Sequence, residues 1–221
     1  MPESRLVRPV PYRGGGFDPK SNRWVSLLTF VSVLAFWEVS SRSGWVSELF
    51  LPAPSSAAMA LVELYNSGQL MLHISASMQR LSIGWSLGII FGIVFGFSAG
   101  LFSLARAGVV PLVSAVFPIP KIALLPLFII WFGIGEESKV ATIFFGTFFP
   151  TVISTFGGVD SVDRGLIRMG QSFNLNWLSI VLKIILPGAL PAILSGMRIS
   201  AAIAIILLVA AEMIGAEFGI G

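Results

Sequence analysis

Two prolines and a lysine stand within one turn of an otherwise apolar stretch, at Pro118, Pro120 and Lys121. Proline lacks a backbone N–H, so two prolines this close leave carbonyl groups of the same turn without partners. Irregular backbone at membrane depth is tolerated where it lines a watery cavity, and a charge at that depth is a functional candidate. The pattern predicts a broken helix with a cation beside a pathway for an anionic solute. The alternative is that the span starts later and that Lys121 reaches the inner interface.

A second candidate site is the stretch over 157–183, the longest connection that the sequence predicts on the inner side. We expect two short helices in it. Asp160 or Ser161 can cap the first helix, and the carboxylate of Asp163 suits its positive N-terminus. A structured amphipathic loop of this kind predicts a docking surface for a cytoplasmic partner, and the alternative is an interfacial helix that lies on the bilayer.

The sequence also predicts where each of the two loop helices ends. Leu166, Ile167 and Phe173 give the first helix its apolar contacts, and the run Asn174-Leu-Asn176 makes a turn after it. We expect the second helix over 177–185 and its end at Leu186-Pro187, because proline does not continue a helix.

Residue patterns of known catalytic sites are missing from the sequence. It has one histidine, His73, and no cysteine, and it lacks the motifs H-E-x-x-H and G-x-S-x-G. The run Gly-Ile-Gly-Glu-Glu-Ser-Lys at 133–139 lacks the Gly-Lys-Ser/Thr ending of a phosphate-binding loop. We therefore expect no catalytic residue, no metal site and no cofactor. Energy for transport must then come from an ion gradient or from another subunit.

Charge is scarce along the chain, since 11% of its 221 residues are charged and 55% are hydrophobic. A soluble domain has about a quarter of its residues charged, so the composition excludes a soluble enzyme, a disordered chain and a coiled coil. The net charge of +3 could suggest nucleic acid. In so apolar a chain, however, basic residues orient membrane segments. We expect a membrane protein without a nucleic-acid partner.

Stretches with at most one charge each predict five membrane spans, over 24–39, 81–105, 107–135, 140–159 and 184–211. About 20 apolar residues cross the hydrocarbon layer as a helix. The runs do not alternate as strands of a barrel would, so the fold is expected to be all-α, a polytopic helical membrane protein. Residues 24–37 also resemble the core of a signal peptide. The long basic segment before them and the run Trp37-Glu38-Val39 favour a retained helix.

Basic residues flank these spans unevenly. With the N-terminus in the cytoplasm, only Arg42, Arg80 and Lys139 lie outside, and Lys121 and Arg198 fall within spans. An excess of basic residues marks the cytoplasmic side, so we expect a multi-pass protein of the cell inner membrane with its N-terminus inside. The basic residues that this orientation places inside are Arg5, Arg8, Arg13, Lys20, Arg23, Arg106, Arg164, Arg168 and Lys183.

The outer connection over 41–80 is expected to hold a short helix over about 56–66, with Ser55-Ser56 as its N-terminal cap. His73 lies in this connection without a carboxylate near it in the sequence, which is typical of a surface residue. Glu38 and Glu212 stand at the edges of spans. Ion-coupled carriers use carboxylates inside the membrane, so this distribution disfavours a proton-coupled carrier.

Five glycines recur at intervals of four within the second span. Such a stripe lets a neighbouring helix approach closely. Its function would be either a sliding surface between helices or static packing. The glycines are Gly84, Gly88, Gly92, Gly96 and Gly100.

The inner loop and the run Ile-Ile-Leu-Pro at 184–187 resemble the coupling segment of permease subunits of bacterial ATP-binding cassette importers. That family's pattern is Glu-Ala-Ala, three residues, Gly, nine residues, Ile-x-Leu-Pro. Here Arg168-Met169-Gly170 stands where the family has Glu-Ala-Ala, and Asn174 where it has glycine. Other runs are similar to the nitrate, sulfonate and taurine branch, at 51–55, 118–126, 131–135, 186–191 and 211–213.

The resemblance covers roughly residues 50–221 and implies a type I importer permease fold, a homodimer, a cytoplasmic ATP-binding subunit and an extracytoplasmic solute-binding protein. Family members carry one more helix, so we expect five spans of six, with the family-like core over about 75–221. Residues 1–23 are expected to be a cytoplasmic tail and 24–221 the permease domain. An ion-coupled secondary carrier and a truncated scaffold without transport are the alternatives.

The resemblance also implies two sets of site residues. The translocation path would include Pro118, Pro120, Lys121 and Glu212, although Glu212 could instead pair with Arg198 or with a backbone donor. A small anion would be the solute, and lipid would surround the spans. The residues expected to couple to the ATP-binding subunit are Asp163, Arg164, Arg168, Met169, Gly170, Phe173, Asn174, Trp177, Leu186 and Pro187.

Overall fold

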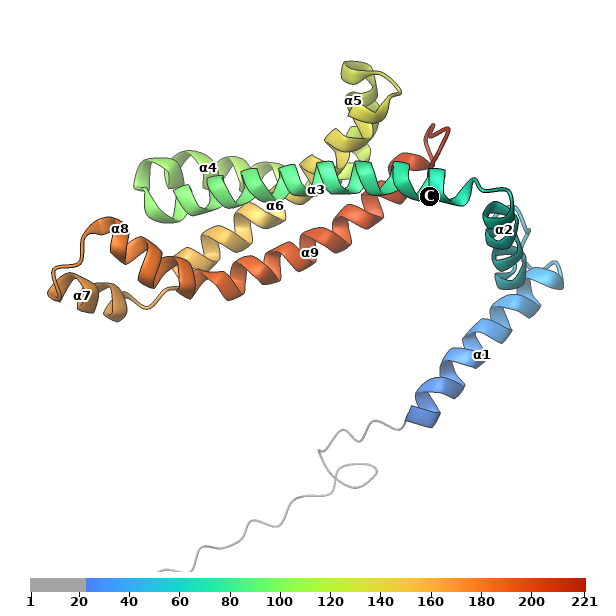
Figure 1. Cartoon of the computed structure of the whole chain (residues 1–221), viewed down its shortest axis with the longest axis horizontal. Helices are drawn as coiled ribbons and strands as arrows, with labels where there is room; N and C mark the ends of the chain where they lie inside the picture. The colour runs from blue at the N-terminus through green and yellow to red at the C-terminus, as the bar shows by residue number, and fades with distance from the viewer. Residues whose placement is uncertain (1–22) are drawn as a thin grey trace, which may run out of the picture. The chain divides into compact units, whose positions relative to one another are not determined.

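The computed structural model describes residues 23–221, which form helices and connecting turns without a strand in that range (Figure 1). The chain divides into two compact units, one that ends at Ser67 and one that runs from Gly68 to Gly221. The expectation of an all-α fold is confirmed for this range. The predicted tail over 1–23 lies outside the described residues except for Arg23, which begins the first helix.

The first unit contains α1 (Arg23–Arg42) and α2 (Pro54–Asn66). The predicted cap of α2 at Ser55-Ser56 is wrong: Ala53 is the N-cap residue, its side chain makes no capping hydrogen bond, and Pro54 begins the helix. Proline suits that position because its fixed φ is helical and its missing N–H would be unpaired anyway. The Ser55 hydroxyl instead donates to Glu38 Oε1 at 2.6 Å, and so ties α2 to α1.

The second unit is built around three long helices that run side by side in Figure 1. α3 (Leu70–Leu101) and α9 (Leu186–Glu212) both pack against α6 (Glu136–Asp160). Shorter elements join them: α4 (Ser103–Val116), the 3-10 helix η1 (Lys121–Leu124) and α5 (Leu125–Phe132) after α3, and α7 (Arg164–Ser172), α8 (Trp177–Ile180) and the π-helix η2 (Val181–Ile185) before α9.

Four helical stretches of the described range are long and apolar enough to cross a membrane: α1, α3, α6 and the stretch from Trp177 to Glu212. The fifth predicted span is a bent pair, α4 and η1–α5, which meet at 91°. The bend falls at Phe117–Pro120, where the prolines predict a break. The prediction of five spans is therefore met when this bent pair counts as one.

Two predicted boundaries are wrong. α3 begins at Leu70 rather than at 81, so Arg80 lies inside a helix rather than in an outer loop. The second loop helix does not end at Leu186-Pro187, because α8, η2 and α9 follow one another without a break. The wider π turn comes directly before Pro187, where a missing N–H interrupts the α-helical hydrogen bonds.

The glycine stripe of α3 faces α6, which confirms the predicted close approach of a neighbouring helix. A Cβ atom at Gly92 would lie 2.6 Å from Thr151 Cβ, and one at Gly96 would lie 2.6 Å from the Val152 carbonyl oxygen. Both distances are too short for real contacts, so only glycine fits at this separation of the two helices. Static packing accounts for this geometry, and the sliding surface stays a prediction.

Candidate functional site

Lys121 closes the proline turn at the end of α4. Its Nζ donates hydrogen bonds to the carbonyl oxygens of Val116 at 2.7 Å, Phe117 at 3.0 Å and Ile119 at 2.8 Å. The last carbonyls of a helix have no partner within the helix, and the following prolines offer no N–H. The carbonyls that the sequence leaves unpaired are thus satisfied by the ammonium group beside them.

The Lys121 ammonium lies against the middle of α6. Its Nζ is 4.8 Å from the centre of the Phe149 ring, and Phe149 is close to the midpoint of a helix that runs from Glu136 to Asp160. The side chain is half-buried, and within residues 23–221 no carboxylate forms an ion pair with it. A cation therefore stands near mid-depth of the helix bundle without a charged partner in the described range.

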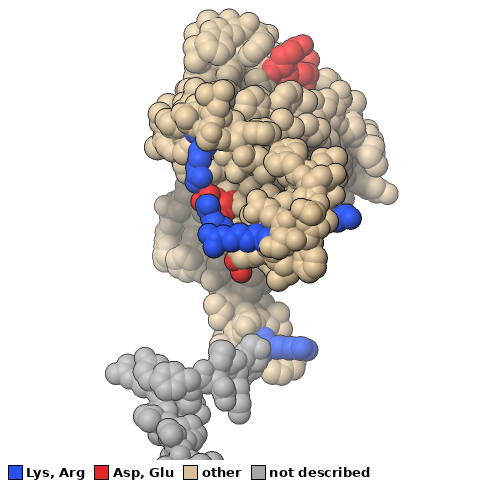
Figure 2. Space-filling view, turned by 90° about the vertical axis from the view of Figure 1, so that its left-hand side faces the viewer, with Lys and Arg blue, Asp and Glu red and all other residues tan. Residues whose placement is uncertain are grey.

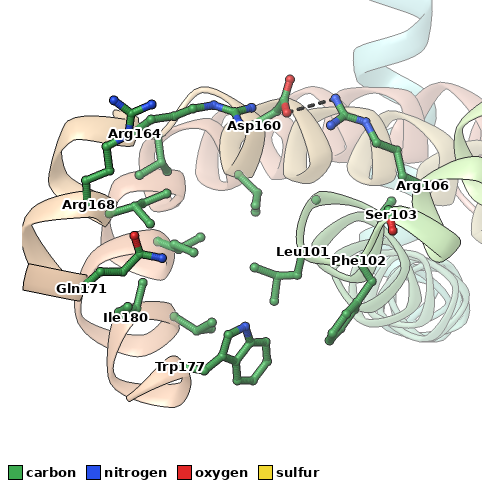
Figure 3. Close-up of a pocket in the computed structure, with 17 residues that line it drawn as sticks. Leu101, Phe102, Ser103, Arg106, Asp160, Arg164, Arg168, Gln171, Trp177 and Ile180 are labelled. Carbon is green, nitrogen blue, oxygen red and sulfur yellow. Dashed lines mark hydrogen bonds and ion pairs between the residues drawn. The ribbon is translucent and has the colours of Figure 1, made fainter. Parts of the chain in front are cut away.

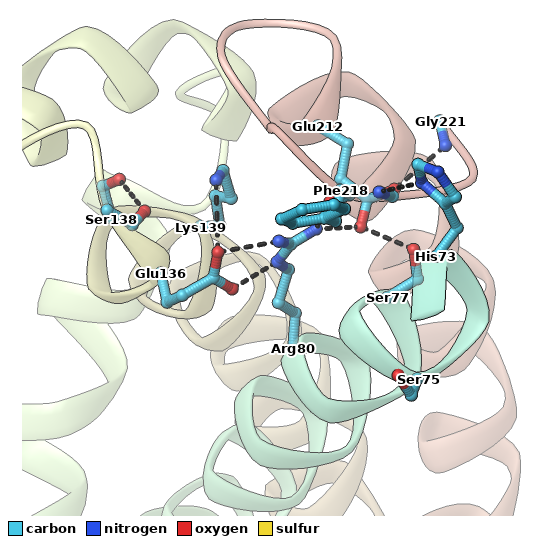
Figure 4. Close-up of polar contacts among 12 residues, drawn as sticks. His73, Ser75, Ser77, Arg80, Glu136, Ser138, Lys139, Glu212, Phe218 and Gly221 are labelled. Atoms are coloured by element: carbon cyan, nitrogen blue, oxygen red, sulfur yellow. Dashed lines mark hydrogen bonds and ion pairs between the residues drawn. The ribbon is translucent and has the colours of Figure 1, made fainter. Parts of the chain in front are cut away.

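At one end of the second unit, Glu212 accepts four hydrogen bonds (Figure 4). Its carboxylate takes donors from Ser77 Oγ at 2.7 Å, Arg80 Nη1 at 2.6 Å, and the backbone N–H groups of Ile220 at 3.0 Å and Gly221 at 2.9 Å. The side chains of Arg80 and Glu212 are 3% and 1% exposed. The alternative of a pair with Arg198 is wrong, whereas the alternative of backbone donors is confirmed.

Arg80 joins three long helices at this end. Besides Glu212 on α9, Arg80 binds both carboxylate oxygens of Glu136 on α6. Its Nη2 donates to Oε1 at 2.7 Å, and its Nε donates to Oε2. Lys139 adds a longer contact to Glu136 at 3.5 Å. We call Arg80, Glu136, Lys139 and Glu212 the outer ion cluster, after the side of the membrane that the sequence predicts for them. A cavity of about 400 Å³ lies beside it, lined by Arg80, Glu136, Lys139 and Phe218 among others.

The sequence does not predict that the four residues of the outer ion cluster meet, and the surroundings that it predicts for His73 are wrong. His73 is half-buried, its Nδ1 accepts from the N–H of Gly219 at 3.0 Å, and its ring packs on Phe218. The expectation of an isolated surface histidine is wrong. One signal was available: Arg80, Glu136 and Glu212 each stand at the outer end of a different predicted span, so they share one depth.

The opposite end of the unit carries the loop predicted for docking. Asp163 is the N-cap of α7, and its Oδ1 accepts from the N–H of Gly165 at 2.7 Å. The predicted caps Asp160 and Ser161 are wrong, since they end α6, and Asp160 pairs with Arg106 at 3.0 Å. The predicted turn is confirmed, because Asn174 has φ of 54°, which reverses the chain between α7 and α8.

A cavity of about 550 Å³ lies between this loop and the junction of α3 with α4 (Figure 3). Arg164, Arg168 and Trp177 of the predicted coupling set line it, together with Arg106 and Asp160. Met169 and Phe173 are exposed, and Gly170 is buried against Ile184. Leu186 lines a separate apolar groove with Leu182 and Phe102. The structure thus gathers most of the coupling set at one end, whereas Lys121 and Glu212 lie at different depths.

The sequence matches the family of binding-protein-dependent transport system inner membrane components over residues 88–221. A relative from Bacillus subtilis (strain 168), named "Putative aliphatic sulfonates transport permease protein", is 37% identical over 195 residues, which cover 88% of this chain and 71% of the relative. A relative from Escherichia coli (strain K12) with the same name is 37% identical, covering 86% of this chain and 73% of the relative. The taurine transport system permease protein of Escherichia coli (strain K12) is 36% identical, covering 89% and 74%.

These similarities cover most of both chains and agree with the helical fold described above. They place the chain in the nitrate, sulfonate and taurine branch and make it a multi-pass inner-membrane protein rather than an enzyme. The ATP-driven importer is favoured over the ion-coupled carrier. The chain belongs to the family of binding-protein-dependent transport system inner membrane components and is a permease subunit of an ATP-driven importer.

Proposed function

We propose that this permease imports a small anionic solute of the sulfonate, taurine or nitrate type. The relatives described above are named for the transport of aliphatic sulfonates or taurine. The observation that carries the proposal is the half-buried ammonium of Lys121 against the middle of α6. A cation in the low dielectric of a membrane protein attracts an anion far more strongly than it would in water.

In this proposal the broken turn lines the translocation path. Pro118 and Pro120 are exposed on the same turn as Lys121, so solute can approach the ammonium group there. Glu212 marks the outer end of the path, where its carboxylate is engaged by Arg80 in the described arrangement. Alternating access then carries the solute past Lys121 between the two sides of the membrane.

Neutralising Lys121 tests the path. Lys121→Gln keeps N–H donors for the turn carbonyls but removes the charge, so we expect uptake of taurine or an alkanesulfonate to fall about ten-fold, because the anion loses its counter-charge. Lys121→Arg keeps charge and donors and is expected to keep most of the uptake. The measurement is uptake into proteoliposomes that hold the complete transporter, at equal amounts of inserted permease. Uptake by Lys121→Gln at the rate of the unsubstituted chain would show that the charge does not act on the solute.

ATP is hydrolysed by a separate subunit that docks on the inner loop. The proposed contact residues are Asp163, Arg164, Arg168, Met169, Gly170, Phe173, Asn174, Trp177, Leu186 and Pro187. The exposure of Met169, Phe173 and Trp177 supports docking, because apolar side chains in water are stabilised by a partner that covers them. Gly170 acts indirectly, since it lets α7 approach Ile184.

Deleting residues 163–176 is expected to abolish co-purification of the ATP-binding subunit, because the deletion removes α7 and the turn that follows it. Membrane insertion should persist, since α6 and α9 are untouched. The check is affinity purification of the permease followed by quantification of the bound subunit. Undiminished co-purification from correctly inserted permease would overturn the docking assignment.

The remaining parts of the proposal concern assembly. Two copies form a homodimer surrounded by lipid, and an extracytoplasmic binding protein delivers the solute. The end with α7 faces the cytoplasm, which puts the N-terminus on the same side. Residues 24–221 form one permease domain in this proposal. Arg106, Arg164, Arg168 and Lys183 lie at that end, and Arg80 and Lys139 lie at the other. An excess of basic residues marks the cytoplasmic side.

A further inference from the structure

The helix α7 is held in place by one of its faces. Gly170 is buried, and a Cβ atom there would lie 2.7 Å from Ile184 Cδ1 of the π-helix. Its carbonyl accepts from the N–H of Leu175 at 3.1 Å, which fixes the turn after the helix, and Ile167 packs on the same core. The opposite face therefore has a defined orientation even though α7 has only nine residues.

The rest of the surface of α7 is apolar on one side and cationic on the other. Leu166, Met169 and Phe173 are 49%, 55% and 74% exposed and recur at helical spacing. Arg164 and Arg168 stand four positions apart, about 150° around the helix from this stripe, and are also exposed. Figure 2 shows the end of the unit that carries α7 and α8, where basic side chains gather near the middle of the face.

The two arginines are placed where they weaken the helix. Arg164 is the first residue of α7, where the positive end of the helix dipole repels a cation, and like charges four residues apart repel each other. Neither has an ion pair among the described residues: Asp163 caps the helix and Asp160 is taken by Arg106. A negative surface on a partner would offset both repulsions.

The position of α7 favours a protein over lipid as the source of this negative charge. α9 alone has 27 residues, about 40 Å of helix, whereas the hydrocarbon layer is about 30 Å thick. With Glu212 and the outer ion cluster at the outer boundary of that layer, the Leu186 end of α9 already reaches the inner headgroups, and η2, α8 and α7 lie at that end. α7 is attached at that end, in the cytoplasm.

We propose that the surface of the ATP-binding subunit that receives α7 is acidic, and that carboxylates on it contact Arg164 and Arg168. This inference rests on the proposed docking of that subunit on the loop. The apolar stripe supplies contact area on one side of α7, and the two guanidinium groups on the other side select a subunit with acidic residues at matching positions. Figure 3 shows both arginines along one edge of the cavity of about 550 Å³, so carboxylates approaching from that edge reach them from solvent.

Charge reversal tests the inference on the full-length permease in nanodiscs of neutral phosphatidylcholine. The double variant Arg164→Glu with Arg168→Glu is expected to raise the Kd for the ATP-binding subunit of the same transporter at least about ten-fold, since carboxylates would then face carboxylates. The double variant with lysines is expected to stay within about three-fold of the unsubstituted chain. Higher salt should weaken binding of the unsubstituted chain more than that of the double glutamine variant.

The controls separate this inference from the docking proposal. If deletion of 163–176 abolishes binding while charge reversal leaves the Kd unchanged, docking stands and the acidic surface is wrong. Lys183→Glu changes another exposed cation at the same end, and an equal loss there would show a general charge effect and overturn the assignment to α7. An effect of charge reversal that appears only in nanodiscs with anionic lipid would assign α7 to the bilayer instead.

Discussion

Arg80→Met is expected to lower the free energy of unfolding by about 3–5 kcal/mol, because it leaves the carboxylate of Glu212 buried without a cation. Glu212 is 1% exposed, so water cannot replace the lost guanidinium group. The substitution also removes the link from α9 to Glu136 on α6. Unfolding in detergent, followed by tryptophan fluorescence or by heat, measures the loss.

Two matched variants show whether charge is the cause. Adding Glu212→Gln to Arg80→Met removes the orphaned charge and is expected to recover part of the stability, since a neutral amide is less costly to bury. Glu136→Gln should cost less than about 1 kcal/mol, because that side chain is 59% exposed. An Arg80→Met chain as stable as the unsubstituted one would show that the outer ion cluster does not hold the helices together.

Gly96→Ala is expected to destabilise the second unit by about 1–3 kcal/mol, because the added methyl group would lie 2.6 Å from the Val152 carbonyl oxygen. The obstacle is backbone, so no side-chain rotation relieves it and α3 must move away from α6. Gly96→Leu enlarges the clash and should prevent recovery of folded permease. The same unfolding measurement, with the yield of monodisperse protein, reports both effects.

Gly157→Ala, on α6, is the control, since a Cβ atom at Gly157 would meet no atom within 4 Å. Alanine in an open helical position is expected to raise stability by about 0.4–1 kcal/mol. Gly88→Ala clashes chiefly with the Thr147 side chain, so adding Thr147→Ala should recover part of that loss. Equal stability of Gly96→Ala and Gly157→Ala would contradict the packing described for this interface.

Local patterns account for what could be predicted. The spans follow from runs of apolar residues, and the close approach of α3 to α6 follows from glycines four residues apart, because both signals lie within one helix. The bend at Pro118 and Pro120 is equally local. The inner loop follows from its length between two apolar runs, and the predicted turn over 174–176 agrees with the positive φ that asparagine tolerates at Asn174.

What could not be predicted depends on partners distant in sequence. Arg80 binds Glu136 and Glu212, which are 56 and 132 positions away, and a charge at the edge of an apolar run is indistinguishable from a loop residue. The role of Lys121 as donor to three carbonyls needs the folded turn, and the sequence shows only that a cation is near. Ser55 was assigned to its own helix because its true partner, Glu38, lies 17 positions earlier.

The continuous helix α9 has a mechanical consequence for transport. A helix of 27 residues, about 40 Å long, acts as a lever when it tilts as a rigid body. A tilt of about 10° around its midpoint moves each end by about 3–4 Å in opposite directions, within the range of helix shifts by which proteins switch state. A push by the ATP-binding subunit that reached the Leu186 end through η2 would thus arrive at Glu212 as a sideways displacement that strains its contact with Arg80.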